Sequence, residues 1–216
     1  MKKDKAFEQE KKRKLSPREE QRLARFETLC AEMEQKGYRK RELMIGIVKA
    51  NVVTMLLAIP LCAAAILLFL AVSPGSLHAL SLTELIIWLV SFFVLTVVHE
   101  GIHGLTWSRF TPNGFRDIDF GFMKQYLTPY CTCRVPLSKG QYIFGALMPL
   151  IVLGILPMLA GILSGSLLVL ALGILMTDSA AGDIMIVWNV LRYRSPAGEI
   201  VYMDHPTQAG GVIFEK

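Results

Sequence analysis

The sequence predicts an all-α membrane protein with four transmembrane helices, a small cytoplasmic β-hairpin element and an N-terminal cytoplasmic amphipathic helix. Three observations predict this fold. The 216 residues are 53% hydrophobic and only 19% charged, which is well on the apolar side of a soluble domain. Residues 1–42 hold 14 of the 23 Lys and Arg residues, so the charge is concentrated at one end. The remainder contains four apolar segments, each near the roughly 20 residues that a helix needs to cross a bilayer core.

The predicted organisation therefore has three parts. Residues 1–42 are a charged cytoplasmic arm, and residues 43–192 are a four-span membrane domain whose connector at 108–141 carries β structure. Residues 193–216 are a cytoplasmic tail, irregular except for one strand at 199–203. The first residues lack the apolar core of a secretory signal. Acidic residues are mixed through the arm and aromatics are few, so we expect contact with lipid headgroups and no binding of nucleic acid.

Within the arm, a helix is predicted over about residues 17–36. Ser16 is a candidate N-cap, and Glu19 completes a capping box three residues later. Gly37 is expected to end the helix. Apolar residues recur at helical spacing within it, so the helix is amphipathic. Such a helix either docks on a partner or the membrane surface, or packs against the protein's own body.

The four spans are predicted at about residues 50–72, 85–107, 142–163 and 167–191. The connector between the first two spans and the connector between the last two contain no Lys or Arg. Positive charges mark cytoplasmic loops, so both termini and the connector 108–141 are expected in the cytoplasm. The expected location is thus a multi-pass position in a bacterial cell membrane, in contact with the lipid bilayer.

The long middle connector shows the alternation of two short strands. "RDIDFGF" places Ile118, Phe120 and Phe122 on one face, and "YCTCRV" places Cys131 and Cys133 on one face. A β-hairpin at the cytoplasmic membrane surface is the expected structure. The cysteines follow no disulfide framework and are expected as free thiols. Metal binding by the two strand cysteines is the alternative.

Three ionisable residues interrupt the second span in "VVHEGIHGL". His99 and His103 are four residues apart, which puts both imidazoles on one face of a helix, where they can share a metal ion. Glu100 follows the first histidine, as in zinc peptidases, where it is the general base that activates a metal-bound water. Ionisable groups inside a membrane span indicate a functional site, since burying them uncompensated is costly. The pattern predicts catalytic Zn²⁺ rather than a structural polar cluster.

A third ligand is needed, because catalytic zinc takes three protein ligands and keeps an open position. Asp183 is favoured, since it lies nine residues before Arg192 and His99 lies ten before Arg109. At 1.5 Å per residue, both groups lie about 14–15 Å above a cytoplasmic positive charge. Small residues near both are expected to let the helices approach closely. Asp178 is the alternative within the spans, and the acids outside the spans are Asp117, Asp119, Glu199 and Asp204.

These motifs resemble a known family. "VVHEGIHGL" in a span, a connector with "DFGF", a "QYIFGALMPL" span and a last span with "GD" are similar to the bacterial zincin-type peptidases long catalogued as a domain of unknown function. The resemblance covers roughly residues 85–206. More distantly, the chain is similar to site-2 proteases, which implies His99, His103 and Asp183 as zinc ligands and Glu100 as the base. The Leu-Asp-Gly setting of that group is absent here, and there is no room for a PDZ module.

The combined expectation is a zinc-dependent, membrane-embedded metalloendopeptidase that hydrolyses peptide bonds of peptide or membrane-protein substrates. Glu100 would take the proton of the water and deliver it to the leaving amine. A membrane metal transporter or sensor that uses the same His and Asp residues is the alternative. A structural scaffold with a relic site is a third possibility, and it predicts no bound metal.

Overall fold

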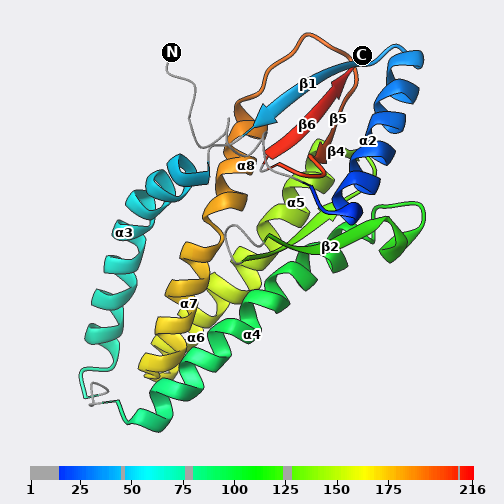
Figure 1. Cartoon of the computed structure of the whole chain (residues 1–216). Helices are drawn as coiled ribbons and strands as arrows, with labels where there is room; N and C mark the ends of the chain where they lie inside the picture. Colours follow the sequence, from blue (N-terminus) through cyan, green and yellow to red (C-terminus); the bar gives the residue numbers. More distant parts are fainter. Residues whose placement is uncertain (1–14, 45–46, 76–79, 124–127, 209) are drawn as a thin grey trace.

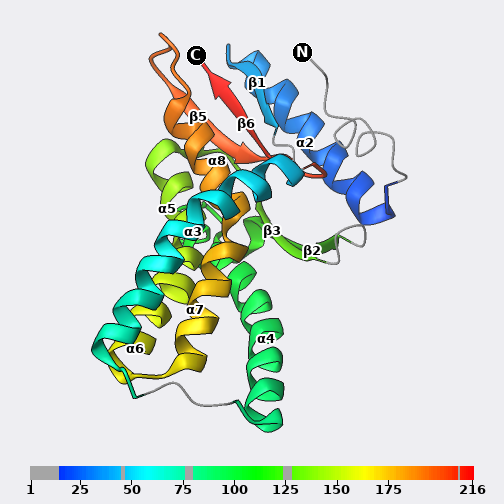
Figure 2. The same ribbon diagram turned by 90° about the vertical axis from the view of Figure 1, so that its left-hand side faces the viewer.

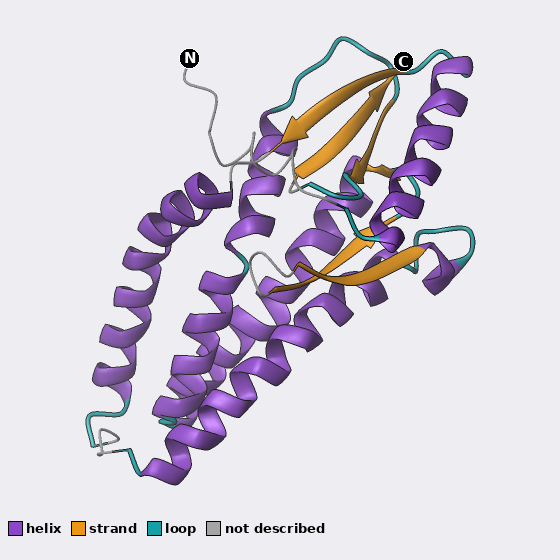
Figure 3. Ribbon diagram, in the orientation of Figure 1, coloured by secondary structure: helices purple, strands orange, loops and turns teal. Residues whose placement is uncertain are grey.

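The computed structural model describes residues 15–44, 47–75, 80–123, 128–208 and 210–216 (Figure 1). Most of the described residues lie in helices. Long helices form a bundle, and the strands lie together at one end of it with helix α2 (Figures 1 and 3). The first and the last of the described strands lie side by side in this layer (Figure 2).

Helix α2 (Pro17–Gln35) confirms the predicted amphipathic helix. Ser16 caps it, and Ser16 and Glu19 form the predicted capping box. The chain leaves the helix at Gly37, whose φ of +87° is the left-handed conformation that glycine adopts without strain. Phe26 and Met33 on its apolar face pack against the sheet described below, so the helix covers the protein's own body.

Two continuous helical segments are long and apolar enough to cross a membrane. One is α4 (Leu82–Trp107), and the other runs through α5 (Lys139–Pro149), η2 (Leu150–Ile155) and α6 (Leu156–Ser164). Nearly all of the apolar window in α4 is exposed, with only 6% of it buried. An exposed apolar surface of that size is typical of contact with a membrane or with another protein.

The predicted fourth span is not one regular helix. It consists of α7 (Leu167–Ser179) and α8 (Ala181–Arg192), bent by 47° at Ala180, and only the bent pair together is long enough to span. Just before the bend, the Thr177 and Ser179 hydroxyls donate to carbonyls one turn back. Such bonds compete with the helical ladder and bend helices. In α3 (Ile47–Val72) only Ala58–Val72 qualifies as a shorter apolar helix, so the first span stays a prediction.

The third span contains a π-helical turn, η2, between two prolines. Pro149 is the last residue of α5, and Pro157 lies in the first turn of α6. Proline has no N–H to donate to the helical ladder, so the chain accommodates it with wider turns. Close packing follows in α6 and α7, where a Cβ on Gly161 would meet the backbone of Leu170.

The chain has more β structure than predicted, so it is not purely all-α. Four strands form an antiparallel sheet in the order β1 (Arg39–Met44), β6 (Gly210–Glu215), β5 (Ile200–Asp204) and β4 (Leu137–Ser138). The prediction of a tail with a single strand was wrong. All six residues of β6 are buried, so the alternation that marks a half-buried strand is missing. Its neighbour β1 comes from the charged arm, more than 160 residues away.

The predicted hairpin is confirmed as β2 (Ile118–Met123) and β3 (Thr128–Cys133), which pair antiparallel. It lies against the end of α4, where Ile118 and Phe120 are the nearest neighbours of a Cβ placed on Gly104. Phe120 and Phe122 nevertheless remain 51% and 56% exposed. The hairpin therefore sits between α4 on one side and α2 on the other, as its contacts with Arg22 and Arg25 show.

Candidate metal centre

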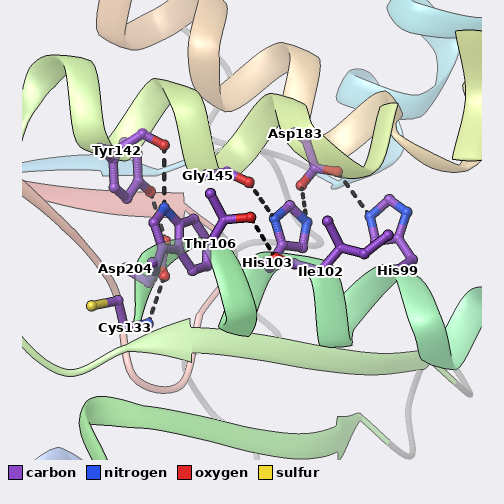
Figure 4. Close-up of polar contacts among 10 residues, drawn as sticks. His99, Ile102, His103, Thr106, Cys133, Tyr142, Gly145, Asp183 and Asp204 are labelled. Carbon is purple, nitrogen blue, oxygen red and sulfur yellow. Dashed lines mark hydrogen bonds and ion pairs between the residues drawn. The ribbon is translucent and has the colours of Figure 1, made fainter. Parts of the chain in front are cut away.

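The two histidines of the second span and one aspartate of the last converge inside the bundle (Figure 4). His99 and His103 lie on α4 and are only 6% and 3% exposed. Asp183 lies in the first turn of α8, directly after the bend. Its carboxylate oxygens are 3.0 Å from Nε2 of His99 and 3.3 Å from Nε2 of His103. One nitrogen from each ring and one carboxylate oxygen all lie within 4.8 Å of one another.

The tautomer of His103 is set from outside the group. Its Nδ1 lies 2.9 Å from the carbonyl oxygen of Gly145 on α5, so Nδ1 must carry the hydrogen and donate it. In neutral His103, Nε2 then points its lone pair at the carboxylate of Asp183. Two acceptors facing each other at 3.3 Å repel unless a metal cation or a proton lies between them. This orientation, with one ring nitrogen anchored on a carbonyl, is typical of metal-bound histidine.

The donor set fits a catalytic zinc ion. Two imidazole nitrogens and one carboxylate oxygen are ligands that Zn²⁺ accepts, and three protein ligands leave a fourth position open. Nδ1 of His99 is buried and has no hydrogen-bond partner among the described residues. The ring of His99 is therefore held by its packing and by Asp183, and not by a second hydrogen bond.

Glu100 lies beside this group and not within it. Its half-buried carboxyl interacts electrostatically with His99, His103 and Asp183, and it also interacts with the backbone of Cys131 on β3. The carboxyl thus sits between the metal-capable group and the hairpin. A carboxylate so placed can accept a proton from a water molecule held at the open position.

The other predicted ligand candidates lie elsewhere. Asp178 is half-buried on α7 and interacts with Cys62 of α3. Asp119 pairs with Arg134 and, at 3.4 Å, with Arg25. The remaining acids, Asp117, Glu199 and Asp204, are outside the metal-capable group of the described residues.

The cysteines and His205 are also outside the metal-capable group of the described residues. Cys131 and Cys133 are buried free thiols, and burial raises the pKa of the Cys133 thiol to about 12, so it stays protonated. His205 accepts backbone N–H bonds from Thr207 and Gln208 at 3.3 and 3.1 Å, which gives it a role in its loop. His78 lies outside the described residues.

A column of stacked rings, missed by the sequence reasoning, joins the metal-capable group to the four-stranded sheet. The ring of His103 stacks on Trp107 with centroids 5.0 Å apart, and Trp107 stacks on Tyr142 at 5.9 Å. Tyr142 in turn stacks on Tyr202 of β5 at 6.1 Å. A Cβ on Gly145 would strike the indole of Trp107, so glycine is needed there. Trp107 follows His103 by four residues, and this spacing was the one sequence feature that could have indicated that the two rings stack.

The glycines near the site do not make the close contact between α4 and α8 that was predicted for small residues there. Gly104 accommodates the hairpin, and not the helix that carries Asp183. A Cβ on Gly101 or Gly182 would have no atom of the described chain within 4 Å. The approach of Asp183 to the histidines therefore depends on the bend at Ala180 and on α5, which contacts both α4 and α8.

Asp204 anchors the column to the hairpin. Its buried carboxylate accepts a hydrogen bond of 2.6 Å from the Tyr142 hydroxyl and one of 3.0 Å from the backbone N–H of Cys133. These two bonds connect β5 with α5 and β3. Burial raises the pKa of Asp204 from 3.8 to about 6.

We expect the pKa of Asp204 to make the stability of the protein depend on pH. A raised pKa means that the folded state holds the proton more tightly, so this contribution is full below pH 4 and is lost as the pH rises through 6. The loss amounts to about 3 kcal/mol of unfolding free energy. Unfolding midpoints of the wild type and Asp204→Asn between pH 4 and 7 measure it. A difference between them that stays constant with pH contradicts the prediction.

Comparison with known proteins gives one match. Residues 92–197 match the model of a protein family described as "Putative zincin peptidase". No curated protein and no solved structure matches the chain. The matched region includes both histidines of α4, the hairpin, the third span and Asp183.

Proposed function

Because the chain belongs, over residues 92–197, to the family described as "Putative zincin peptidase", we propose that it is a zinc-dependent, membrane-embedded endopeptidase. Its substrates are peptides or membrane-associated proteins. One observation carries the proposal: His99, His103 and Asp183 offer ligand atoms within 4.8 Å of one another inside an apolar bundle. Burying three such groups together is compensated when they share a cation.

The proposed roles follow from the positions of the side chains. His99, His103 and Asp183 hold Zn²⁺, which when bound lowers the pKa of water and polarises a carbonyl. Glu100 accepts a proton from the attacking water and delivers it to the departing amine nitrogen as the peptide bond breaks. The carbonyl of Gly145 keeps the His103 ring oriented through Nδ1. The surrounding apolar helices exclude bulk water.

We place the site near the cytoplasmic side of the membrane. His103 is four residues before the end of α4, or about 6 Å along the helix axis. The extramembrane layer lies at that same end of the bundle (Figure 1). Its basic residues, and the absence of Lys and Arg between α6 and α7, support a cytoplasmic position for both termini.

Metal removal tests this function directly. Purified full-length protein in lipid nanodiscs is expected to cleave unstructured peptides and to lose that activity by more than about 100-fold after chelation, because zinc activates the water. Adding back Zn²⁺ should restore hydrolysis, whereas Mg²⁺, which prefers oxygen ligands, should not. Hydrolysis that persists in protein shown by elemental analysis to be metal-free would rule out the proposal.

The alternative is a membrane metal transporter or sensor with the same ligands. It has no use for Glu100 as a base. The position of Glu100 between the metal-ligating group and the hairpin favours the peptidase, and the Glu100 variant described in the Discussion separates the two functions.

A further inference from the structure

A groove separates helix α2 from the β2–β3 hairpin. Its volume is about 930 Å³, near the upper end of the range for ligand sites. Arg22 and Arg25 line it, together with Phe120, Phe122 and Tyr130. A smaller cavity of about 170 Å³ shares both arginines and extends inward to Met203 and Asp204 of β5. We call the two spaces together the Arg22 groove.

Arg22 is an unusual residue in this groove, because its guanidinium is buried with two donors unused. The side chain is 9% exposed. One nitrogen donates to the Tyr130 hydroxyl, and the guanidinium carbon lies 4.9 Å over the Tyr130 ring. Its Nε and Nη1 have no hydrogen-bond partner among the described residues. Tyr130 itself lies where a Cβ on Gly121 would be, so the hairpin holds the ring in place.

The acids nearby are already engaged. Asp119 pairs with Arg134 and Arg25, and Glu19 accepts the hydrogen bonds of the Ser16 cap. Among the described residues, four arginines and three acids line the two spaces, the third acid being Asp204, so one positive charge remains in excess. A buried cation without a counter-charge destabilises a fold. An anionic group entering the groove would supply that charge and the missing acceptors.

We propose that the Arg22 groove binds an acidic segment of the peptide substrate, with an Asp or Glu side chain accepted by Arg22. This inference rests on the proposed peptidase function. A peptide is favoured over a lipid headgroup because the smaller cavity leads away from the bundle toward the sheet. The aromatic side chains beside the arginines suit an extended peptide with alternating side chains.

The hairpin connects this groove with the metal centre. Phe120 lines the groove and also lies against Gly104, the residue after His103. On the same hairpin, the backbone of Cys131 interacts with Glu100. A peptide held beside the hairpin would therefore lie next to the element that borders the reacting groups, and recognition of the acidic residue would occur outside the bilayer.

Direct binding to an inactive enzyme tests the proposal. Full-length protein with Glu100→Gln, in nanodiscs of zwitterionic lipid, is titrated with labelled peptides that differ only in one Glu or Gln. We expect the Glu peptide to bind about 10- to 100-fold more tightly, the range of a hydrogen bond to a charged group. Arg22→Met should abolish this preference, chiefly by weakening the binding of the Glu peptide.

Two further variants keep the test decisive. Arg18→Met removes an exposed arginine from the same groove and should change the preference by less than about fivefold. Arg22→Met should leave the unfolding midpoint unchanged or raise it. If the Arg22→Met protein does not fold, the test uses Arg22→Lys, which keeps the charge. A purely structural Arg22 would lower the midpoint without changing the preference for Glu.

Equal affinity for the two peptides, or a preference that survives Arg22→Met, would overturn the proposal. Binding that instead depends on phosphatidylglycerol in the nanodisc and on Arg22 would assign the groove to a lipid headgroup, and this also overturns it. Binding is measured without cleavage, so failure of the peptidase function shows separately, as absence of hydrolysis by the wild type. Hydrolysis with no Arg22-dependent preference would reject the groove alone.

Discussion

Glu100→Gln is expected to lower the rate of peptide hydrolysis by about 10²- to 10⁴-fold, the usual contribution of a general base. Glutamine is nearly isosteric but cannot accept the proton of the attacking water. Glu100 lies beside the His99, His103 and Asp183 group, and the group's ligand atoms come from those three residues. Bound zinc should therefore remain stoichiometric in the variant. Hydrolysis rates and zinc content of the same preparation measure both effects.

The control for this variant is Glu84→Gln on the same helix. Glu84 completes the capping box at the far end of α4, and glutamine can serve in that position too. Activity should be unchanged there. A transporter or sensor would keep its function in Glu100→Gln, because it needs no base. Full hydrolysis in Glu100→Gln would remove Glu100 from the mechanism, and loss of zinc would make it a ligand.

His99→Ala, His103→Ala and Asp183→Ala are each expected to weaken zinc binding by more than about 100-fold. Mutation of a residue that only hydrogen-bonds to a ligand already lowers metal affinity by about 10- to 100-fold. Removing a ligand leaves two donors, and removing Asp183 also takes away the negative charge that faces both rings at 3.0 and 3.3 Å. Elemental analysis and competitive titration with a chelating dye give the stoichiometry and the affinity.

Asp178→Ala is the matched control, since it removes an aspartate from the other half of the bent span. Asp178 lies before the bend and interacts with Cys62, so zinc should be retained. Zinc retained in Asp183→Ala and lost in Asp178→Ala would reassign the third ligand. Absence of metal in the wild type would favour a scaffold with a relic site.

Local interactions made several elements predictable. Ser16 and Glu19 specify the start of α2 by themselves, because both partners of the capping box lie within four residues. The hairpin follows from alternating side chains in two neighbouring segments. The spacing of His99 and His103 is also local, since one helical turn separates them on one face of α4. Asp183 was predicted from its depth, from nearby small residues and from the resemblance to site-2 proteases, and the structure brings it to the histidines.

Other features, namely the four-stranded sheet and the bend in the last span, depend on contacts between residues that are distant in sequence. The sheet joins β1 to β6 across most of the chain, and β6 lacks alternation because both of its faces are covered. The bend at Ala180 turns a predicted span into two helices and places Asp183 in the first turn of the second.

The sequence alone thus determined the chemistry offered by α4: two imidazoles on one face and a carboxylate beside them. The tertiary structure decided which residues of other elements contact those side chains. The carbonyl of Gly145 on α5 orients His103, and Trp107 fits only because Gly145 has no side chain. Arg22 is buried against Tyr130 because α2 folds back onto the hairpin, and its Nε and Nη1 find no hydrogen-bond partner among the described residues. Periodicity reports the neighbours of a residue on its own helix or strand, whereas packing between elements depends on shapes and charges that no local pattern encodes.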